Sequence, residues 1–191
     1  MKTAGRESEA PWAPVVFISY SRKDIEFVRR LDAELKRRDR KAWVDWEGIW
    51  PGDKWENRIY KAIEDTNAFI FVLTPDSVSS EVCEKEIAHA AANNKRLVPV
   101  LYRDVKAASV PKSVAELNWI LCRDNDDFQK AIDTVISALD TDIEWVRAHT
   151  RLLTRAIEWQ TKGMNSSFVL RGDDLKAAEQ WLAQAGSDKE R

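Results

Sequence analysis

The run 68-AFIFVLT-74 sets the fold class, because an almost wholly apolar strand is typical of the centre of a parallel sheet covered on both faces. Four other short segments of the chain also have the pattern of strands: 15–20, 42–46, 97–102 and 117–122. Pro99 favours a sheet edge or a bulge for its segment, because proline has no backbone N–H to donate to a neighbouring strand.

Helical hydrophobic spacing fills the intervals between these strands. Ser21 and Asp24 fit a capping box that opens the first helix, and apolar residues then recur at helical spacing from Ile25 to Leu35. Strands that alternate with helices predict an α/β domain with a parallel sheet and right-handed crossovers. Five strands in this rhythm predict the flavodoxin-like order 2-1-3-4-5, in which ligands bind at the carboxyl ends of the strands, near the switch between strands 1 and 3.

The last third of the chain is predicted to be helical. Residues 126–162 contain neither glycine nor proline, so they form either one long helix or two helices joined near 140–142. A final helix over 173–185 is predicted to face inward through Leu175, Ala178 and Leu182. We therefore divide the chain into a leader over 1–13, a flavodoxin-like domain over 14–140 and a C-terminal helical extension over 141–191.

The composition bounds the classes of function. The chain has 191 residues, of which 44% are hydrophobic and 32% charged, as in an ordinary soluble globular protein. Its net charge of -2 gives no large positive electrostatic field that would attract nucleic acid or an anionic membrane. We interpret the basic run 36–41 as a helix end, where cations suit the helix dipole. Two cysteines argue against a disulfide framework. No apolar run approaches the ~20 residues of a membrane span, and the N-terminus lacks the apolar core of a signal peptide, so a cytosolic location is expected.

The segment 79-SSEVCEKEIAHAA-91 follows the central strand as a predicted helix and carries three glutamates. A stripe of small and apolar residues buries one face of this helix. Glu84 and Glu86 lie on opposite flanks of the stripe, while Glu81 points further from it. The helical period therefore sets Glu81 aside and leaves Glu84 and Glu86 as alternatives for a chemical role.

Nine tryptophans is a high count for this length, and four of them fall within thirteen residues. Trp43 alternates with Val44 in a strand and is expected in the core. Trp46, Trp50 and Trp55 are candidates for stacking on an aromatic ring of a ligand. For Trp55, core packing is an equal alternative, and Trp50 lies in a loop, where an exposed aromatic side chain can anchor an interface.

Three motifs, found in the family's order, resemble those of TIR (Toll/interleukin-1 receptor) domains. They are the first strand 16-VFISYSRKD-24, the second strand with its loop 43-WVDWEGIWPGDKW-55, and the third strand with its helix 69-FIFVLTPDSVSSEVCEKEI-87. The resemblance covers roughly residues 14–140 and points to a bacterial-type domain. It implies assembly through TIR–TIR contacts and, as in many members, cleavage of NAD+ between nicotinamide and ribose.

The resemblance also implies roles for single residues. In 82-VCEKE-86 the family's catalytic glutamate falls on Glu86, and Val82 stands where the family motif has an aromatic residue. The substrate pocket implied by the resemblance comprises Phe17, Ser19, Tyr20, Ser21, Arg22, Asp45, Trp46, Trp55, Val82 and Cys83. Arg22 either pairs with a pyrophosphate or is an ordinary cation at a helix start, and Asp45 either borders the pocket or caps its loop. NAD+ is expected as substrate, with no cofactor and no metal site, since His89 and His149 lack ligand spacing.

One carboxylate is enough for this reaction. Glycosidases pair an acid with a second carboxylate because a poor leaving group needs a proton. Nicotinamide instead leaves NAD+ as a neutral molecule from a nitrogen that is already cationic. The remaining demand is the positive charge that develops on the ribose, which a carboxylate stabilises.

The expected function is therefore a TIR-domain NAD+ glycohydrolase that is activated by self-association, in bacterial defence against phage. The sequence does not decide whether the product is linear ADP-ribose or a cyclic isomer. The contacts between domains are assigned to the loop 46–55. The alternative is a non-catalytic TIR adaptor that acts by protein interaction. A response-regulator receiver is set aside, because the places of its acidic pair and phosphoacceptor read Ser-Tyr-Ser and Thr-Pro.

Two interpretations of the extension stay open. It resembles segments that join TIR domains to a sensor or repeat module in a larger parent protein, or it is a helical pair that packs on the sheet and completes the fold. Within it, 145–159 is amphipathic and arginine-rich. We hypothesise that this helix contributes contacts between copies of the chain.

Overall fold

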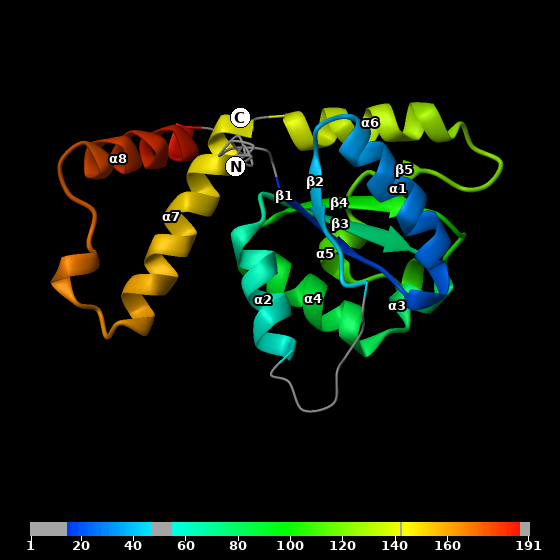
Figure 1. Cartoon of the computed structure of the whole chain (residues 1–191), viewed down its shortest axis with the longest axis horizontal. Helices are drawn as coiled ribbons and strands as arrows, with labels where there is room; N and C mark the ends of the chain where they lie inside the picture. The colour runs from blue at the N-terminus through cyan, green and yellow to red at the C-terminus, as the bar shows by residue number, and fades with distance from the viewer. Residues whose placement is uncertain (1–14, 47–54, 142, 188–191) are drawn as a thin grey trace, which may run out of the picture.

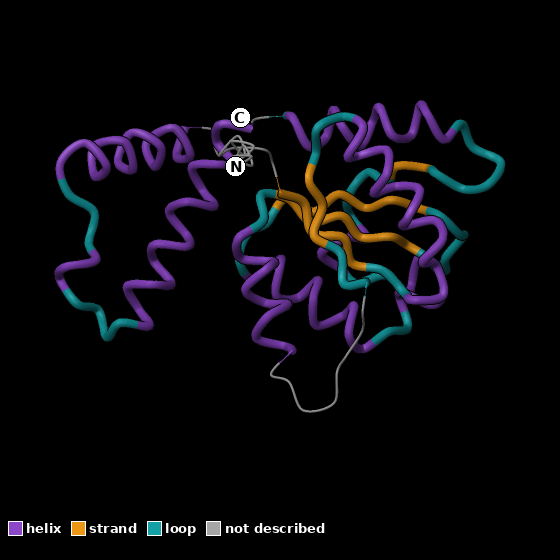
Figure 2. The backbone as a smooth tube through the Cα atoms, viewed as in Figure 1, coloured by secondary structure: helices purple, strands orange, loops and turns teal. Residues whose placement is uncertain are grey.

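The computed structural model describes residues 15–46, 55–141 and 143–187. Five parallel strands form one sheet in the order β2-β1-β3-β4-β5 (Figures 1 and 2). The strands are β1 Val15–Ser19, β2 Lys41–Trp43, β3 Ala68–Leu73, β4 Arg96–Leu101 and β5 Ile120–Leu121. The predicted fold class and strand order are confirmed.

Helices connect the strands and extend the chain beyond the sheet. The α-helices of the described residues are α1 Ile25–Arg37, α2 Trp55–Asp65, α3 Pro75–Val78, α4 Glu81–Ala92, α5 Lys112–Ala115, α6 Phe128–Asp140, α7 Ile143–Thr161 and α8 Gly172–Ser187. Three 3₁₀ turns accompany them, η1 Arg22–Asp24, η2 Ala107–Ser109 and η3 Ser166–Phe168. Of the two alternatives for 126–162, the structure shows two helices. None of the described helices has both the length and the apolar character that crossing a membrane requires.

The sheet is buried on both faces, as the central strand predicts. Along β3, Ile70 and Val72 belong to a core shared with α1 and α6, whereas Phe69, Phe71 and Leu73 belong to a second core shared with α2 and α4. Figure 1 shows these helix pairs on opposite sides of the sheet. Each fully buried side chain of this kind contributes about 1.5–3 kcal/mol to folding, so the two cores fix the sheet on which the site is built.

Two strands are shorter than predicted, and the edge prediction for Pro99 is wrong. β2 ends at Trp43 and β5 has two residues, so the predicted strands over 42–46 and 117–122 continue as loop. β4 is an inner strand that pairs with β3 over its whole length, and Pro99 lies opposite Phe71 of β3. β5 pairs only with the end of β4, from Val100 onward, so no β5 residue is paired with Pro99.

The predicted capping box between Ser21 and Asp24 is also wrong. The Ser21 hydroxyl accepts from the N–H of Lys23, while the Asp24 carboxylate turns inward and is 4% exposed. There it accepts a hydrogen bond from Thr74 Oγ1 at 2.8 Å and from Arg103 at 2.6 Å. A buried carboxylate needs such partners, and this one ties the carboxyl end of β3 to the start of α1.

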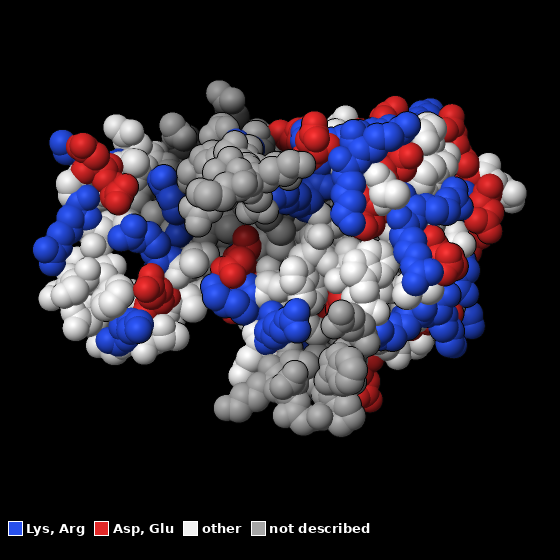
Figure 3. All heavy atoms as spheres, viewed as in Figure 1, with Lys and Arg blue, Asp and Glu red and all other residues white. Residues whose placement is uncertain are grey.

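The basic run 36–41 is a paired helix end, as interpreted from the sequence. Arg38 pairs with Glu34 and with Asp133, and the Arg40 guanidinium lies 2.7 Å from Asp140. Figure 3 shows side chains of both signs interspersed over this part of the surface. On the face of the described residues that Figure 3 shows, this mixture of charges forms no continuous basic patch of the kind that binds nucleic acid.

The C-terminal extension docks on α2. On α7, Val146 and Thr150 are buried, and Thr150 Oγ1 lies 3.4 Å from the carbonyl oxygen of Thr66, just past the end of α2. Beside it, the buried Lys95 ammonium donates to the carbonyls of Glu64 and Thr66 at 2.6 and 2.8 Å, which suits a cation at a helix C-terminus. Burial lowers the pKa of Lys95 to about 8.

The outer helix of the extension differs from its prediction. α8 packs on α7, and both helices lie beside the sheet rather than over it (Figure 1). Leu175, Ala178 and Leu182 face α7 across an apolar hollow, as predicted, but Leu175 and Leu182 stay 42% and 66% exposed, so this face is not buried. The alternative of a pair that packs on the sheet fails as well, because α7 packs on α2. The division of the chain at residue 140 stays a prediction, and the leader over 1–13 lies outside the described residues.

Candidate active site

A hollow of about 190 Å³ opens at the carboxyl end of β1, between the segment that follows β2 and the first turns of α4. This is the switch point between strands 1 and 3, where ligands bind in sheets of this order. We call it the Glu86 pocket, and its lining residues are Phe17, Ile18, Tyr20, Ser21, Arg22, Asp45, Ile59, Ser80, Val82, Cys83 and Glu86.

Glu86 is the buried acid of this pocket. The helix α4 starts after Ser80, whose side chain accepts from the N–H of Cys83, and this start turns Glu86 toward the sheet. Glu86 is 7% exposed, whereas Glu81 and Glu84 on the same helix are exposed. The structure thereby separates the two alternatives that the helical period left open.

Ser19 holds the Glu86 carboxyl group. The Ser19 hydroxyl, 1% exposed at the end of β1, donates to Glu86 Oε2 at 2.5 Å. Burial raises the pKa of Glu86 from 4.5 to about 7, against the opposing effect of the Ser19 hydrogen bond. Asp45 raises this pKa further and Arg22 lowers it. The pocket therefore presents a desolvated carboxyl group that ionises near neutral pH.

The mouth of the pocket carries an ion pair. Arg22 and Asp45 lie 2.9 Å apart, with 51% and 34% of their side chains exposed. The Tyr20 hydroxyl donates to the Asp45 carbonyl at 3.1 Å, and burial raises the pKa of this tyrosine. The Arg22 guanidinium is thus oriented by its neighbour and keeps further N–H donors for an anion.

Phe17 forms the floor of the pocket and belongs to the core beneath it, against which Trp43 packs. The Phe17 ring stacks on Trp43 at 4.8 Å and on Phe69 at 5.3 Å. Trp43 is half-buried and packs against this core, so the core position predicted for it holds only in part. Trp46 is 36% exposed and lies against Tyr20 at 6.4 Å, beside the residues that line the pocket rather than among them. Trp50 and the side chain of Trp55 lie outside the described residues, so their predicted roles stay predictions.

The thiol of Cys83 is part of the pocket wall. Burial, followed by the nearby Glu86 charge, raises the pKa of this thiol to about 11. The group is therefore a neutral thiol at physiological pH, and a thiolate nucleophile is not available here. Val82, at the position where the family motif has an aromatic residue, gives the wall an aliphatic side chain instead.

Sequence reasoning missed part of the lining. Ile18, Ile59 and Ser80 contribute to the pocket without having been predicted. Two of them were visible in the sequence: Ser80 stands where an N-cap of α4 belongs, and Ile59 lies in the apolar stripe of α2. In the described ranges, no group of three or more His, Cys, Asp or Glu side chains is arranged to hold a metal ion.

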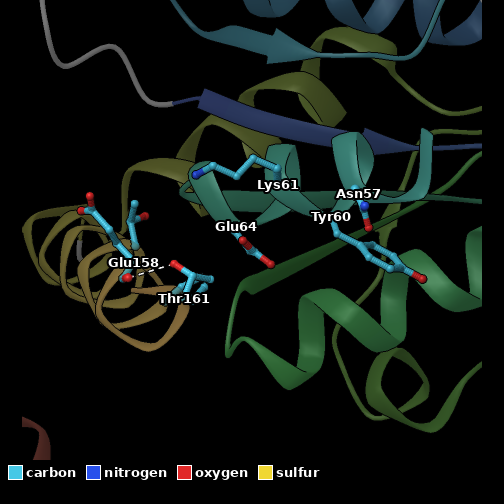
Figure 4. Close-up of a pocket in the computed structure, with 8 residues that line it drawn as sticks. Asn57, Tyr60, Lys61, Glu64, Glu158 and Thr161 are labelled. Atoms are coloured by element: carbon cyan, nitrogen blue, oxygen red, sulfur yellow. Dashed lines mark hydrogen bonds between the residues drawn. The ribbon is translucent and has the colours of Figure 1, made fainter. Parts of the chain in front are cut away.

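A larger hollow, of about 590 Å³, lies between α2 and α7 (Figure 4). We call it the α2–α7 groove, and its lining residues are Asn57, Tyr60, Lys61, Glu64, Thr154, Ile157, Glu158 and Thr161. Two of its charged groups pair with neighbours: Glu64 Oε1 lies 3.0 Å from His89 Nε2, and Lys61 pairs with Asp65 at 2.6 Å, while Glu158 is exposed. Despite its size, the groove offers no buried carboxyl group, so we place the candidate active site at the Glu86 pocket.

A parallel sheet in the order 2-1-3-4-5 defines the class of doubly wound α/β proteins. Members of this class bind ligands at the carboxyl edge of the sheet, which is where this chain has its buried carboxyl group. The TIR domain family matches residues 16–136, well over half of the sequence, and the chain belongs to this family.

Known proteins resemble the same part of the chain. A probable 2' cyclic ADP-D-ribose synthase of Brachypodium distachyon is 29% identical over 121 residues, which cover 61% of this chain and 54% of that protein. The chain thus matches about half the length of this relative. The TIR domain of a Toll-related receptor from Hydra magnipapillata is 26% identical with a TM-score of 0.53, over 63% of this chain and 93% of that one. A TIR-STING receptor from C. gigas is 28% identical with a TM-score of 0.54, over 65% of this chain and 38% of that one.

Proposed function

We propose that this TIR domain cleaves NAD+ at the bond between nicotinamide and ribose, with Glu86 as its catalytic carboxylate. The observation that carries the proposal is Glu86 itself, a residue only 7% exposed whose carboxyl group is held by Ser19 at the hollow of the switch point. The similarity to a probable 2' cyclic ADP-D-ribose synthase supports the same chemistry.

The chemistry suits a single acid. As the bond to nicotinamide lengthens, positive charge develops on the ribose, and the ionised Glu86 carboxylate stabilises that charge at close range. Ser19 occupies Oε2 and leaves Oε1 for the sugar. A preorganised group of this kind in a water-poor site contributes about 3–4 kcal/mol to the transition state.

The size of the pocket indicates which part of the substrate it holds. Its volume of about 190 Å³ lies below the ~300 Å³ at which pockets for whole ligands begin. We assign to it the ribose and nicotinamide, with the pyrophosphate toward the guanidinium of Arg22 and an aromatic ring of NAD+ toward Trp46. No cofactor is part of the proposal, and the product is either ADP-ribose or a cyclic isomer.

Self-association completes the proposal. The loop 46–55, to which the resemblance assigns the contacts between TIR domains, lies outside the described residues except at its ends. Its role in completing a neighbour's pocket stays a prediction, as do the bacterial type of the domain, its role in defence against phage and its location in the cytosol.

The experiment is incubation of the purified chain with NAD+ and measurement of released nicotinamide by chromatography. Glu86→Gln is expected to lose about 10²–10³-fold of the rate, the loss typical of one preorganised electrostatic group. Glu84→Gln is the matched control, because it removes an exposed acid from the same helix and should keep the rate. Equal rates for Glu86→Gln and the wild type would refute the role of Glu86.

The alternative function is a non-catalytic adaptor that acts by protein interaction, and the similarity to the TIR domain of a receptor from Hydra is compatible with it. An adaptor would release no nicotinamide at any protein concentration, including crowded solutions in which TIR domains assemble. Release that depends on Glu86 rejects the adaptor, and the same chromatogram separates a linear from a cyclic product.

A further inference from the structure

Arg103 lies just past the end of β4, and its guanidinium bridges two carboxylates at the carboxyl edge of the sheet. Its Nη2 donates to Asp24 Oδ1 and to Asp76 Oδ2, each at 2.6 Å, and its Nε donates to Asp24 Oδ1 at 3.1 Å. Lys23 pairs with the other oxygen of Asp76 at 2.6 Å, and Figure 1 shows the start of α1 beside α3 at this edge. We call Lys23, Asp24, Asp76 and Arg103 the Arg103 cluster.

The cluster is fixed to the end of the central strand. The backbone N–H of Arg103 donates to the carbonyl of Leu73, the last residue of β3, at 3.2 Å. The Asp24 side chain is 2% exposed, and its second oxygen accepts from the Thr74 hydroxyl at 2.8 Å. A carboxylate this buried keeps its position, because without its partners it would be a desolvated charge.

Both acids of the cluster lie in segments that lead into the Glu86 pocket. Asp24 ends the turn η1, and its N–H donates to the Ser21 carbonyl at 2.8 Å. Ser21 and Arg22 line the pocket. Asp76 lies in α3, which is followed by Ser80, another lining residue. Arg103 therefore joins two segments of the pocket wall without lining the pocket itself.

We propose that Arg103 is a positioning residue for the substrate: through Asp24 it holds the turn η1 so that the Arg22 guanidinium faces the pyrophosphate. This inference rests on the proposed function, in which Arg22 binds the pyrophosphate of NAD+. The ion pair with Asp45 orients the tip of the 51% exposed Arg22 side chain, and the Arg103 cluster fixes the backbone that carries it. Hydrogen bonds between a guanidinium and an oxyanion require this fixed geometry.

The catalytic acid is held separately. Ser19, on β1, binds the Glu86 carboxyl group, and no member of the Arg103 cluster hydrogen-bonds to either residue. Loss of Arg103 should therefore weaken substrate binding and leave the chemical step unchanged.

Calorimetric titration of the whole chain with ADP-ribose tests the proposal without turnover. Arg103→Gln is expected to bind ADP-ribose about tenfold more weakly than the wild type, the effect of one charge-assisted hydrogen bond. The matched control is Arg123→Gln, which should bind like the wild type. Arg123 is 37% exposed against 41% for Arg103, and it also bridges two carboxylates, Asp104 and Asp126, neither of which lines the pocket. Equal affinities for Arg103→Gln and the wild type would overturn the proposal, as would a wild type that does not bind ADP-ribose.

A second variant guards against misfolding, because Arg103→Gln leaves the buried Asp24 charge with one partner fewer. Asp24→Asn combined with Arg103→Gln leaves no such charge, and it should show the same loss of affinity. Circular dichroism confirms that each variant is folded. Wild-type affinity in this folded double variant would also overturn the proposal.

A double-mutant cycle shows whether Arg103 acts through Arg22. Arg22→Ala should weaken ADP-ribose binding about tenfold, and adding Arg103→Gln should weaken it little further, because the positioned group is already gone. Losses that add to about a hundredfold would refute positioning of Arg22 by Arg103.

The kinetics of nicotinamide release separate positioning from a structural role. Arg103→Gln should raise KM about tenfold at unchanged kcat, the pattern of a lost binding contact. A fall in kcat at constant KM would indicate a loss of active protein and overturn the proposal. A wild type that binds ADP-ribose with the coupling described but releases no nicotinamide would reject NAD+ cleavage and retain the role of Arg103.

Discussion

The Glu86 pocket and the α2–α7 groove both present a carboxyl group, a hydroxyl group and an aromatic ring, yet they differ in the solvation of the acid. The groove has about three times the volume, and its Glu64 pairs with His89 while Glu158 faces water. The smaller pocket buries Glu86 to 7% exposure and gives it one hydroxyl donor. Desolvation of the acid, rather than the volume of the hollow, therefore distinguishes the candidate active site from the α2–α7 groove.

Desolvation of Glu86 has a cost in stability. Its pKa rises from 4.5 to about 7, and a difference of this size corresponds to about 3 kcal/mol between the protonated and ionised forms. The pKa of Glu86 is higher in the folded than in the unfolded protein. The free energy of unfolding is therefore highest below pH 4.5, where the group is protonated in both states, and it falls by about 3 kcal/mol as the pH rises through 7. At physiological pH the fold holds an acid that it would stabilise better as a neutral group, which is typical of functional sites.

The largest effect that follows is on the stability of Glu86→Gln. This variant keeps the shape of the side chain but cannot ionise, so at pH 8 it should be more stable than the wild type by up to about 3 kcal/mol. At pH 4.5 the two proteins should have nearly equal free energies of unfolding. Urea denaturation at both pH values measures the difference.

Glu158→Gln in the groove is the matched comparison for this prediction. Glu158 is exposed, and a neutral replacement of an exposed acid changes stability by no more than about 0.5 kcal/mol. If Glu86→Gln and Glu158→Gln had the same small effect at pH 8, the contrast between pocket and groove in desolvation would be wrong.

The sequence predicted the architecture well because the pattern of apolar residues is a local property. The apolar run of β3 and the stripes of α1 and α2 identify strands that alternate with helices, and five strands in that rhythm predict a parallel sheet of this order. The errors fall where a distant residue decides the conformation. Asp24 leaves its predicted capping position because Thr74 and Arg103, far along the chain, offer it a buried hydrogen-bonding site.

For the candidate site, too, local sequence patterns predicted some features, and contacts between distant residues determine the others. The helical period narrowed the acids to Glu84 and Glu86, and only the packing of α4 on the sheet shows which of them is buried. The hydrogen bond from Ser19 joins residues 67 positions apart, and no local pattern contains it. The burial predicted for α8 fails for the opposite reason, since an amphipathic pattern does not reveal whether the chain itself covers the apolar face.

The next effect in size concerns Ser19→Ala. The Ser19 hydrogen bond favours the ionised form of Glu86, so its loss should raise the pKa of Glu86 further, by about one unit for a bond to a charged group. If the carboxylate is the active form, kcat/KM of the wild type rises with an apparent pKa near 7. The Ser19→Ala profile should then lie about one unit higher, with about a tenfold lower rate at pH 6.

A shift in the pH profile of kcat/KM distinguishes a role of Ser19 in setting the pKa of Glu86 from a general structural role. Ser19→Thr keeps a hydroxyl donor and should restore the profile. Thr161→Ala in the groove removes a hydroxyl that donates to the helix carbonyl of Glu158, and it should leave the profile unchanged. A uniform loss of rate in Ser19→Ala, with no movement along the pH axis, would contradict control of Glu86 by Ser19.

The smallest effect is expected for Glu64→Gln in the groove. The glutamine oxygen can still accept from His89, and the stacking of His89 on Tyr60 at 4.3 Å remains. With 16% and 23% of the two side chains exposed, the pair contributes about 1 kcal/mol or less, so urea denaturation at pH 7 should show a loss within that range. Nicotinamide release should stay at the wild-type rate, because the groove takes no part in the proposed reaction. A Glu64→Gln protein that is as stable as the wild type but no longer cleaves NAD+ would move the chemistry from the small buried pocket to the larger groove.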